Sequence, residues 1–304
     1  MLQNNSIVLS ITIVNYNMRE MLEPCLKSVI LYTTGINYEI IVIDNNSTDE
    51  SVEMVRNLFP QVKAIQNKNN RYVAGGFNQA FEQSSGKYIV IMDPDIEIKD
   101  NVFLKLINFL ERNQTIGAVG TRLYSPNNEL YTFCYNRDNN WWYLFFNFTL
   151  IGRMFRKQKE KLRKQFYYNG WDRKTSRYVD WVDTALTVRR VVFEQVGFYD
   201  ENFKLYFIQN DLCKRVREAG WGVYYWAEGK IIHKISQGIN KENFSKISSI
   251  YRHDMEHFIS KYYRLIPAKL LMFLINITRI LLHFFLLFNL YQPKKNIVFG
   301  TLPK

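Results

Sequence analysis

The chain has 304 residues, of which 47% are hydrophobic and 22% are charged, and its formal net charge is +12. This composition is that of a globular protein with a sizeable core and excludes an intrinsically disordered chain. The positive charge favours an anionic partner, such as a phosphorylated substrate, an acidic membrane surface or a nucleic acid. Three cysteines without metal-ligand spacing indicate no disulfide framework and favour a reducing cytosol.

Strands and helices alternate along the first 112 residues. Short apolar or β-branched runs bounded by Gly, Pro and Asn predict the strands, and longer segments between them predict helices. In chain order we predict a strand over 7–14, a helix over 18–31, a strand over 38–44, a helix ending near 59, a strand over 62–66, a helix opened by Ala74-Gly75-Gly76, a strand over 88–92 and a helix over 102–112. This order predicts an α/β fold, with a mostly parallel sheet covered by helices on both faces.

Beyond about residue 120 the pattern is less regular. Residues 141–151 are almost wholly aromatic or aliphatic, and residues 153–164 carry seven basic residues against one acidic residue. We then predict a strand over 178–189, a helix over 191–196, a helix over 211–219, a strand and turn over 224–233, and helical structure from residue 248 onward.

Polar side chains follow the predicted strands at their carboxyl ends, where open α/β sheets bind ligands. Asn15 and Tyr16 follow the first strand, Asp44 ends the second, and Asp93 and Asp95 follow the strand over 88–92. Two carboxylates one residue apart suit Mg²⁺ or Mn²⁺, which bind through one or two carboxylates and the phosphates of a substrate. Taken alone, Asp93-Pro94-Asp95 also reads as a simple turn.

Neither the dinucleotide fingerprint G-x-G-x-x-G nor the phosphate loop G-x-x-x-x-G-K-[ST] occurs in the sequence. A bound nucleotide is therefore expected to be held through a metal ion rather than by a glycine-rich loop.

The ordered set of segments resembles the family 2 glycosyltransferases of the GT-A fold, in particular a bacterial rhamnosyltransferase-like branch, over about residues 7–265. The marks of the resemblance are Ser10-Ile-Thr-Ile-Val-Asn-Tyr-Asn17, Ile41-Val-Ile-Asp-Asn-Asn-Ser-Thr-Asp49, Asn70 with Ala74-Gly75-Gly76 and Asn78, Met92-Asp-Pro-Asp-Ile96, Val179-Asp-Trp-Val182, Val188-Arg-Arg190, Gly197-Phe-Tyr-Asp-Glu201, Asp211-Leu-Cys-Lys-Arg215 and Ile231-Ile-His233. Any one of these segments would be a weak signal, whereas their order makes the resemblance specific.

The resemblance implies an inverting transfer of a sugar from a nucleoside-diphosphate sugar, dTDP-rhamnose or a UDP-sugar, to a hydroxyl of a lipid-linked or glycan acceptor. It implies that Asp44 holds the base, that Asp93 touches the ribose or the metal, and that Asp95 chelates a Mg²⁺ or Mn²⁺ ion. The implied nucleotide site comprises Val14, Asn15, Tyr16, Asp44, Asn46, Asn70, Gly76 and Asp93, and the implied metal site comprises Asp93, Asp95 and His233. Two alternatives stay open: Asp44 as a carboxylate that caps the turn at Ser47, and His233 as a structural histidine.

The sequence departs from the family pattern at the position of the general base. The family usually has Glu-Asp-x-Asp-Leu after the Phe–Tyr stretch, whereas here Ile208 and Gln209 precede Asn210-Asp211-Leu212. A neutral amide at 209 cannot take a proton from the acceptor. Three explanations stay open: Asp211, Asp183 or Asp180 serves as the base, the acceptor is acidic enough to need little help, or the chain is a catalytically impaired homologue that binds nucleotide sugar or supports an active transferase. Asp211 is expected to cap the helix that follows it.

Two smaller departures are Thr184 and Tyr72, where the family usually has glycine. The first puts the identity of the acceptor in doubt, and the second the shape of the loop beside the donor.

The resemblance divides the chain into a nucleotide-sugar-binding half (1–120), an acceptor-binding half of the same domain (121–247) and a helical tail (248–304). Residues 270–290 are long enough to span a bilayer, but Asn276, Arg279 and His283 on one helical face predict an amphipathic helix instead. Whether this helix enters lipid or packs on the domain stays open.

With the basic run over 153–164, the tail predicts peripheral attachment to an anionic membrane, at the cytoplasmic face of a bacterial cell membrane. No nucleic-acid reading motif accompanies the charge, so a nucleic-acid partner is not expected. The sequence makes no prediction of oligomeric state.

Overall fold

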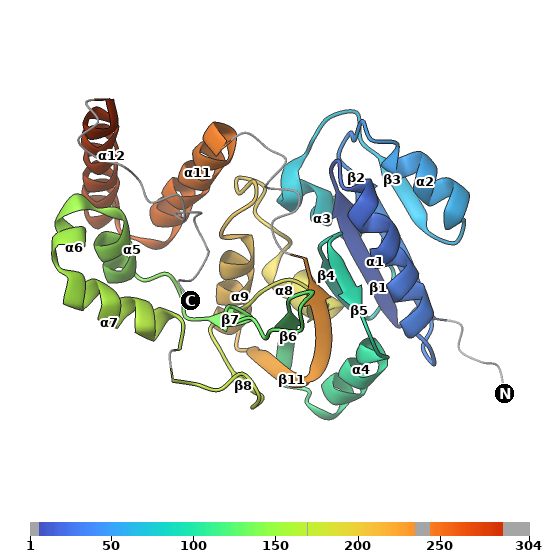
Figure 1. Ribbon diagram of the computed structural model, residues 1–304. Coiled ribbons are helices and arrows are strands. Elements are labelled where there is room, and N and C mark those ends of the chain that lie inside the picture. The colour runs from blue at the N-terminus through green and yellow to red at the C-terminus, as the bar shows by residue number, and fades with distance from the viewer. Residues whose placement is uncertain (1–5, 169, 235–243, 288–304) are drawn as a thin grey trace. The chain divides into compact units, whose positions relative to one another are not determined.

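The computed structural model describes residues 6–168, 170–234 and 244–287, and its main feature is a nine-stranded mixed sheet (Figure 1). The strand order is β3-β2-β1-β4-β10-β6-β11-β5, and β8 pairs with β11 beside this path. The strands are β1 Leu9–Asn15, β2 Tyr38–Asp44, β3 Lys63–Gln66, β4 Tyr88–Met92, β5 Ile96–Ile98, β6 Ile116–Tyr124, β8 Arg177–Tyr178, β10 Leu186–Arg189 and β11 Gly222–His233, with β7 Tyr135–Asn136 and β9 Trp181–Val182 forming a small second sheet.

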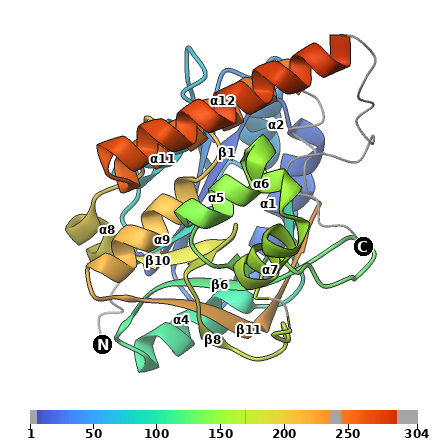
Figure 2. The ribbon, with the colours of Figure 1, turned by 90° about the vertical axis from the view of Figure 1, so that its left-hand side faces the viewer.

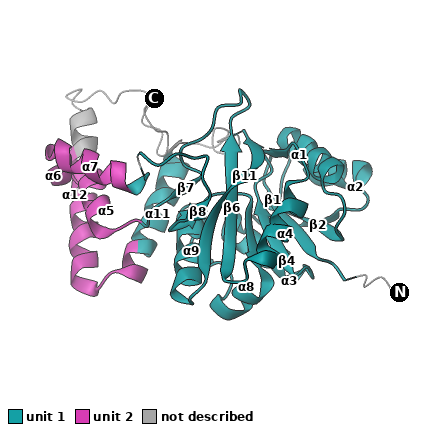
Figure 3. Ribbon diagram, turned by 90° about the horizontal axis from the view of Figure 1, so that it is seen from below, with its two compact units in different colours: residues 1–138, 166–258 teal, residues 139–165, 259–304 magenta. Residues whose placement is uncertain are grey.

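The chain forms two compact units (Figure 3). Unit 1 comprises residues 1–138 and 166–258 and holds both sheets, and unit 2 comprises residues 139–165 and 259–304. The helices of unit 1 are α1 Arg19–Tyr32, α2 Ser51–Leu58, α3 Tyr72–Glu82, α4 Val102–Arg112, α8 Arg190–Val196 and α9 Ile208–Glu218, and most of α11 Phe244–Tyr262 also belongs to it. These units differ from the predicted boundaries, because residues 139–165 join the C-terminal helix and the first part of α11 belongs with the sheet.

The first half of the sheet is parallel, as predicted. In β3-β2-β1-β4, each strand runs parallel to its neighbour, and β1 is buried at every position. The register pairs Asn15 with Asp44 and Ile13 with Met92. The polar residues that end β1, β2 and β4 therefore lie at one edge of the sheet.

The second half of the sheet is mixed and supplies the remaining part of that edge. β10 is antiparallel to both β4 and β6, β11 is parallel to β6, and β5 is antiparallel to β11. The pairing of β5 with β11 places His233 opposite Ile96, the residue after Asp95, and the Lys234 N–H donates to the Asp95 carbonyl at 3.0 Å. A histidine 138 residues beyond Asp95 is thus brought to the end of β4.

Two predicted elements differ clearly from the structure, and one strand was not predicted. The strand expected over 178–189 is broken into β8, β9 and β10, with Ala185 in a left-handed conformation (φ 55°) before β10. β11 continues through the turn expected within 224–233 and absorbs the irregularity as a register shift between Trp226 and Lys230. β6, in the centre of the mixed half, was not predicted.

The helices of unit 2 are α5 Trp141–Phe148, α6 Leu150–Met154, α7 Arg156–Phe166 and α12 Leu265–Leu287, and Figure 2 shows α12 running across α5 and α6. The Leu150 N–H donates to Thr278 Oγ1 at 2.7 Å, and Trp141 Nε1 donates to the Pro267 carbonyl at 3.2 Å. Among the residues that the structure describes, no helix is both long enough and apolar enough to cross a bilayer. The side chain of His283, one of the polar positions predicted on α12, lies outside the described residues.

Candidate active site

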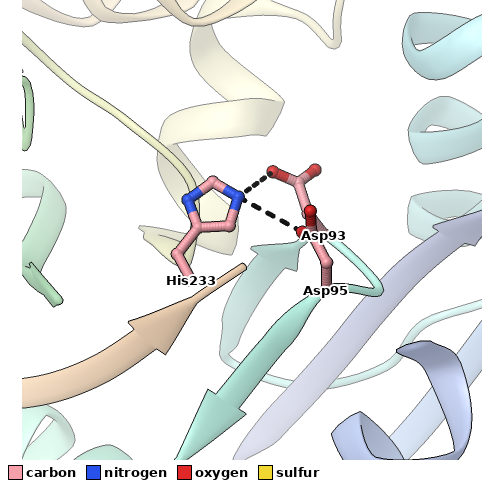
Figure 4. Close-up of side chains that lie close together, drawn as sticks. All are labelled: Asp93, Asp95 and His233. Atoms are coloured by element: carbon pink, nitrogen blue, oxygen red, sulfur yellow. Dashed lines mark ion pairs between the residues drawn. The ribbon is translucent and has the colours of Figure 1, made fainter. Parts of the chain in front are cut away.

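Asp93, Asp95 and His233 form a cluster at the carboxyl edge of the sheet (Figure 4). His233 Nε2 lies 3.2 Å from Asp95 Oδ1 and 3.9 Å from Asp93 Oδ2. Asp95 and His233 are buried, whereas the Asp93 side chain is about one-third exposed. The three residues come from the end of β4, the start of β5 and the end of β11, so the cluster depends on the mixed half of the sheet.

The cluster fits a divalent cation in both geometry and chemistry. Each residue offers one ligand atom, and the three atoms lie within 4.8 Å of one another. Ligands about 2.1 Å from an octahedral ion are separated by about 3 to 4 Å, and the distances of 3.2 and 3.9 Å from His233 Nε2 to the two aspartates lie in that range. Asp95 Oδ1 has His233 Nε2 as its contact at 3.2 Å, whereas His233 Nδ1 is buried with no hydrogen-bond partner among the described residues. Carboxylate oxygens and an imidazole nitrogen are both ligands of divalent metal ions, so the chemistry of the three side chains suits such an ion.

The electrostatics of the cluster are dominated by carboxylates. Burial and the neighbouring Asp95 charge raise the pKa of Asp93 to about 6. Burial opposes a charge on His233, but its contact with Asp95 and the charges of the nearby aspartates outweigh burial and raise its pKa. An excess of negative charge in a buried site favours a cation.

The loop between β9 and β10 lies beside this cluster. The Asp93 N–H donates to Thr184 Oγ1 at 3.2 Å, so Thr184 supports the loop that carries Asp93. Asp183 precedes it, and its N–H donates to the Cys134 carbonyl. Burial raises the pKa of Asp183, the positive charge of His233 lowers it, and Asp95 raises it further. Asp183 therefore shares the electrostatic environment of the predicted metal ligands.

At the ends of β1 and β2, the Asp44 carboxylate accepts two hydrogen bonds. Asp44 Oδ2 accepts from Asn15 Nδ2 at 2.8 Å, and Asp44 Oδ1 accepts from the Ser47 N–H at 2.8 Å. Asn15 Nδ2 also donates to Ser47 Oγ at 3.2 Å. The capping role considered for Asp44 is thus present in the structure, and binding of a base remains a proposal for the same carboxylate.

The remaining residues of the predicted nucleotide site lie on β1, on α3 and on the loops after β1 and β2 and before α3. Gly76 packs so closely on β1 that an added Cβ would lie 2.8 Å from Val14 side-chain atoms. Asn70 Oδ1 accepts from the Tyr72 N–H at 2.7 Å and shapes the turn before α3, where Tyr72 has a φ of 57°. Tyr16 is half-buried, and Asn46 is exposed in a left-handed turn (φ 68°).

Asn45 was not predicted as a site residue, although it directly follows Asp44. It is buried, its Nδ2 donates to the Tyr72 carbonyl at 2.8 Å, and its Oδ1 accepts from the Arg71 N–H at 3.3 Å. It therefore connects the loop after β2 with the loop before α3.

The start of α9 differs from the prediction. The helix begins at Ile208 rather than Asp211, because Phe207 adopts a left-handed conformation (φ 62°) that separates it from the preceding loop. Asp211 therefore lies inside the first turns and does not cap the helix. It is buried, and its Oδ2 accepts from Arg215 Nε at 2.9 Å. Gln209, the residue at the expected base position, lies two residues before Asp211 and is partly exposed.

The third candidate base is also engaged in structural contacts. Asp180 Oδ2 accepts from the Asp138 N–H at 3.0 Å, and its carboxylate bonds to Tyr168, whose pKa is raised mainly by burial.

Asp254 on α11 holds the loop before α9, and nothing in its sequence surroundings predicted this. It is fully buried, and its carboxylate accepts three backbone N–H groups, from Lys204, Leu205 and Tyr206, at 2.8–3.0 Å. The Lys204 carbonyl in turn accepts from the Val73 N–H at 3.0 Å. One carboxylate thus positions a loop that contacts the α3 side of the site and leads into Gln209.

We expect Asp254→Asn to lower the free energy of unfolding by about 2–3 kcal/mol. The carboxylate offers two acceptor oxygens to the three N–H donors, whereas the amide offers only one acceptor oxygen. Urea denaturation of the variant and of Glu53→Gln, which removes an exposed carboxylate from α2, provides the comparison. Equal stability of the two variants would contradict the role given to Asp254.

The sequence profile of glycosyl transferase family 2 matches residues 10–196, which include β1 to β4 and Asp183. The chain is 21% identical over 266 residues to the N-acetylglucosaminyl-diphospho-decaprenol L-rhamnosyltransferase of Mycobacterium tuberculosis strain H37Rv, covering 81% of this chain and 82% of that protein. It is also 32% identical over 115 residues to the dolichol-phosphate mannosyltransferase of Pyrococcus furiosus, covering 37% of this chain. That match spans about a third of the length of the Pyrococcus protein (32%).

Solved structures show the same fold. GalNAc-T7, crystallised with UDP, GalNAc and Mn²⁺, has a TM-score of 0.55 at 16% identity and covers 76% of this chain, which corresponds to 44% of GalNAc-T7. S. aureus TarS 1–349 has a TM-score of 0.53 at 11% identity, over 84% of this chain and 72% of that structure. These likenesses confirm the predicted GT-A fold. With the family profile covering more than half of its residues, the chain belongs to glycosyl transferase family 2.

Proposed function

We propose that this protein is an inverting, metal-dependent glycosyltransferase that moves a sugar from a nucleoside-diphosphate sugar to a hydroxyl of a lipid-linked glycan acceptor in bacterial surface polysaccharide synthesis. The observation that carries the metal dependence is the Asp93–Asp95–His233 cluster, whose ligand atoms lie within 4.8 Å of one another. The Mycobacterium rhamnosyltransferase, matched over 81% of this chain, supports rhamnose as the sugar and a lipid diphosphate as the acceptor. dTDP-rhamnose is therefore the first donor to test, and UDP-sugars are the second.

In this proposal the parallel half of the sheet holds the donor. Asp44 contacts the base, Asn15 and Tyr16 line the nucleotide pocket with Val14, and Asp93 contacts the ribose or the ion. The outer part of the pocket is formed by Asn46, Asn70 and Gly76. Asp95 and His233 would hold Mg²⁺ or Mn²⁺, whose charge, when the ion is bound, stabilises the negative charge of the departing diphosphate.

We assign the general base to Asp183 among the three candidate aspartates. Its carboxylate would take the proton of the acceptor hydroxyl as that oxygen attacks the anomeric carbon, while the bond to the diphosphate breaks on the opposite face of the sugar. Asp183 lies on the loop that supports Asp93, and its pKa is raised mainly by burial, which makes its carboxylate a better proton acceptor. Asp211 is paired with Arg215, and Asp180 accepts from Asp138.

The function is tested by hydrolysis and transfer with a panel of dTDP-, UDP- and GDP-sugars, with Mn²⁺ and with a chelator. We expect the protein to turn over one of these donors, and we expect turnover to stop when the chelator removes the ion. Turnover of no donor, with no binding, would contradict it.

The alternative is a catalytically impaired member of the family that binds nucleotide sugar or supports an active transferase. It is suggested by Gln209, a neutral side chain at the position expected for the general base. Gln209→Asp separates the two. If Asp183 is the base, the carboxylate introduced at position 209 should change kcat by less than about fivefold, because the acceptor proton already has a group to receive it. Steady-state kinetics of wild type and variant provide the measurement, with Gln209→Asn as the matched control. A gain of about 10²-fold or more would instead favour the impaired homologue.

We place the protein at the cytoplasmic face of the bacterial membrane, attached peripherally, because its proposed acceptor is lipid-linked.

A further inference from the structure

The net positive charge of the chain comes from unit 2. Residues 139–165 and 259–304 contain fourteen basic residues and one acidic residue, a formal charge of +13. Unit 1 holds the remaining 26 basic and 27 acidic residues and is nearly neutral at −1. The proposed active site, which lies in unit 1, therefore does not account for the net charge of +12.

Unit 2 also carries most of the exposed apolar surface. Of 17 large hydrophobic side chains exposed among the described residues, 11 belong to unit 2, which supplies less than a quarter of the chain. They are Trp142, Ile151, Met154, Phe155, Leu265, Ile266, Leu270, Phe273, Ile277, Ile280 and Leu281. An exposed apolar surface of this kind marks an interaction site.

Helix α12 has two apolar sides, and within the part of the chain that the structure describes only one of them is covered. Ala268, Leu271 and Ile275 are buried on the side that packs on α5 and α6. On the other side an exposed stripe repeats at intervals of four and three residues, which keeps its members on one face of the helix. This exposed stripe consists of Ile266 (80% exposed), Leu270, Phe273 (60%), Ile277 and Ile280 (68%). One side of α12 thus packs within unit 2, and the other side presents apolar side chains to solvent.

Aromatic contacts extend this apolar surface from α12 to α5 and α6. Trp141 bonds to the Pro267 carbonyl, next to Ile266, and its ring packs edge-on against Trp142 at 4.9 Å between centroids. Trp142 contacts Phe146, which contacts Phe155 at 6.3 Å. The series runs from the first turn of α12 to the exposed residue before α7.

Basic residues are interleaved with these apolar side chains. Arg153 stands beside Met154, and Arg156 beside Phe155. Exposed Arg264 directly precedes Leu265, the first residue of α12, and exposed Lys269 lies beside Leu270 on that helix. Helix α7 continues the positive surface with exposed Arg156, Lys157, Lys161 and Lys164. Mutual repulsion is evident at Lys159, whose pKa is lowered by burial and by the charges of Arg153 and Arg163.

We propose that unit 2 is a membrane-binding module: the exposed stripe of α12 and the aromatic residues of α5 and α6 enter the headgroup region of an anionic bilayer, and the basic residues of α7 pair with lipid phosphates. Aromatic rings suit the headgroup level, and each basic residue near an anionic leaflet strengthens binding. The proposal deepens the proposed function by naming the surface at which the protein would meet a lipid-linked acceptor, and rests on that function only for this connection.

Charge decides between a bilayer and a second copy of the chain as the occupant of this surface. Two copies joined through it would bring two sets of positive charge together, with Glu160 as the single acidic residue in residues 139–165 and 259–304 of each. An anionic bilayer supplies phosphates opposite the same residues. Charge complementarity therefore favours lipid.

The first test is co-sedimentation of the full chain with vesicles of phosphatidylcholine and phosphatidylglycerol, compared with phosphatidylcholine alone. Wild type should bind the anionic vesicles, and salt should weaken binding. The triple variant Arg156→Gln/Lys157→Gln/Lys161→Gln should bind about 100-fold more weakly, since each basic residue contributes about fivefold. The matched control is Arg56→Gln/Arg112→Gln/Lys174→Gln, which removes three exposed charges from unit 1. Equal loss in both variants would overturn the proposal.

The second test addresses the apolar part. Ile266→Gln/Phe273→Gln/Ile280→Gln keeps good helix formers at exposed positions and should weaken vesicle binding about 10-fold or more. Leu31→Gln/Leu58→Gln, exposed in unit 1, is the control and should bind like wild type. If the α12 variant instead changes the molar mass from two chains to one, with vesicle binding unaltered, the surface is an interface between copies and the proposal is wrong.

Donor hydrolysis without vesicles separates this proposal from the proposed function. The variants of unit 2 should hydrolyse donor like wild type, because none of the substituted residues belongs to the proposed site. If the protein binds vesicles but turns over no donor, the membrane-binding module is supported and the proposed enzymatic function is wrong. If the protein is active but does not bind anionic vesicles, the proposed function is supported and the membrane-binding module is wrong.

Discussion

Asp95→Asn is expected to lower kcat/KM for sugar transfer by about 10³-fold, because the substitution removes one charged ligand of the proposed ion and with it stabilisation of the departing diphosphate. Asp95 is buried and lies 3.2 Å from His233, so no exposed carboxylate can take its place without rearrangement. Initial rates at a series of Mn²⁺ concentrations provide the measurement. Part of the loss should be recovered at high Mn²⁺ if affinity for the ion is the main defect.

Glu97→Gln is the matched control for Asp95→Asn. Glu97 lies two residues further along the chain and is paired with Lys99 and Lys234 rather than with the cluster. It should retain wild-type dependence on Mn²⁺. Similar losses in both variants would show that general damage to β5, and not loss of a ligand, reduces activity.

Asp183→Asn is expected to lower kcat by about 10²–10⁴-fold while leaving donor affinity within about twofold, because the proposed base acts on the acceptor hydroxyl and not on the donor. Asp172→Asn, an exposed carboxylate nearby in the sequence, is the control. Single-turnover transfer and donor titration measure the two quantities separately. Wild-type kcat in Asp183→Asn would exclude Asp183 as the base.

The pH dependence gives a second readout for Asp183. A base works when deprotonated, so activity is present above its pKa and is lost as the pH falls through it. Burial raises the pKa of Asp183 above the ordinary range of an aspartate, although the charge of His233 opposes the shift. The acid limb of the kcat profile should therefore lie at higher pH than that of an exposed aspartate, and should be absent in Asp183→Asn.

The parallel half of the fold was predictable because each of its strands carries its own signal. β2 and β4 have the predicted bounds, and α4 also begins and ends as predicted. These strands are buried on both faces, so their sequences are continuous apolar runs that need no tertiary information. The same holds for Asp44, Asp93 and Asp95, which follow directly from the ends of the strands.

β6 was missed because its sequence weakens the strand signal for a reason that only packing explains. It contains Gly117 and Gly120, and an added Cβ at Gly120 would lie 2.6 Å from Val182, while one at Gly117 would lie 2.8 Å from Trp221. Glycine lowers strand propensity but here allows a close approach of neighbouring chain.

The residues that depend on long-range contacts were the hardest to place. His233 was assigned by resemblance to the family, and the pairing of β11 with β5 supplies the physical reason for its position. Asp254 carries no local signal, since its three N–H partners lie about 50 residues earlier in the chain. The start of α9 was misplaced because a left-handed Phe207 is not indicated by its residue type.

We propose that Asp93, Asp95 and His233 bind one divalent cation that links the protein to a nucleoside diphosphate. Titration of the full chain with Mn²⁺, followed by electron paramagnetic resonance with and without dTDP or UDP, tests this binding directly. We expect one bound ion per chain, tighter binding when the nucleotide is present, and loss of the site in Asp95→Asn but not in Glu97→Gln. Unchanged Mn²⁺ binding in Asp95→Asn, or full transfer activity in the presence of chelator, would contradict it.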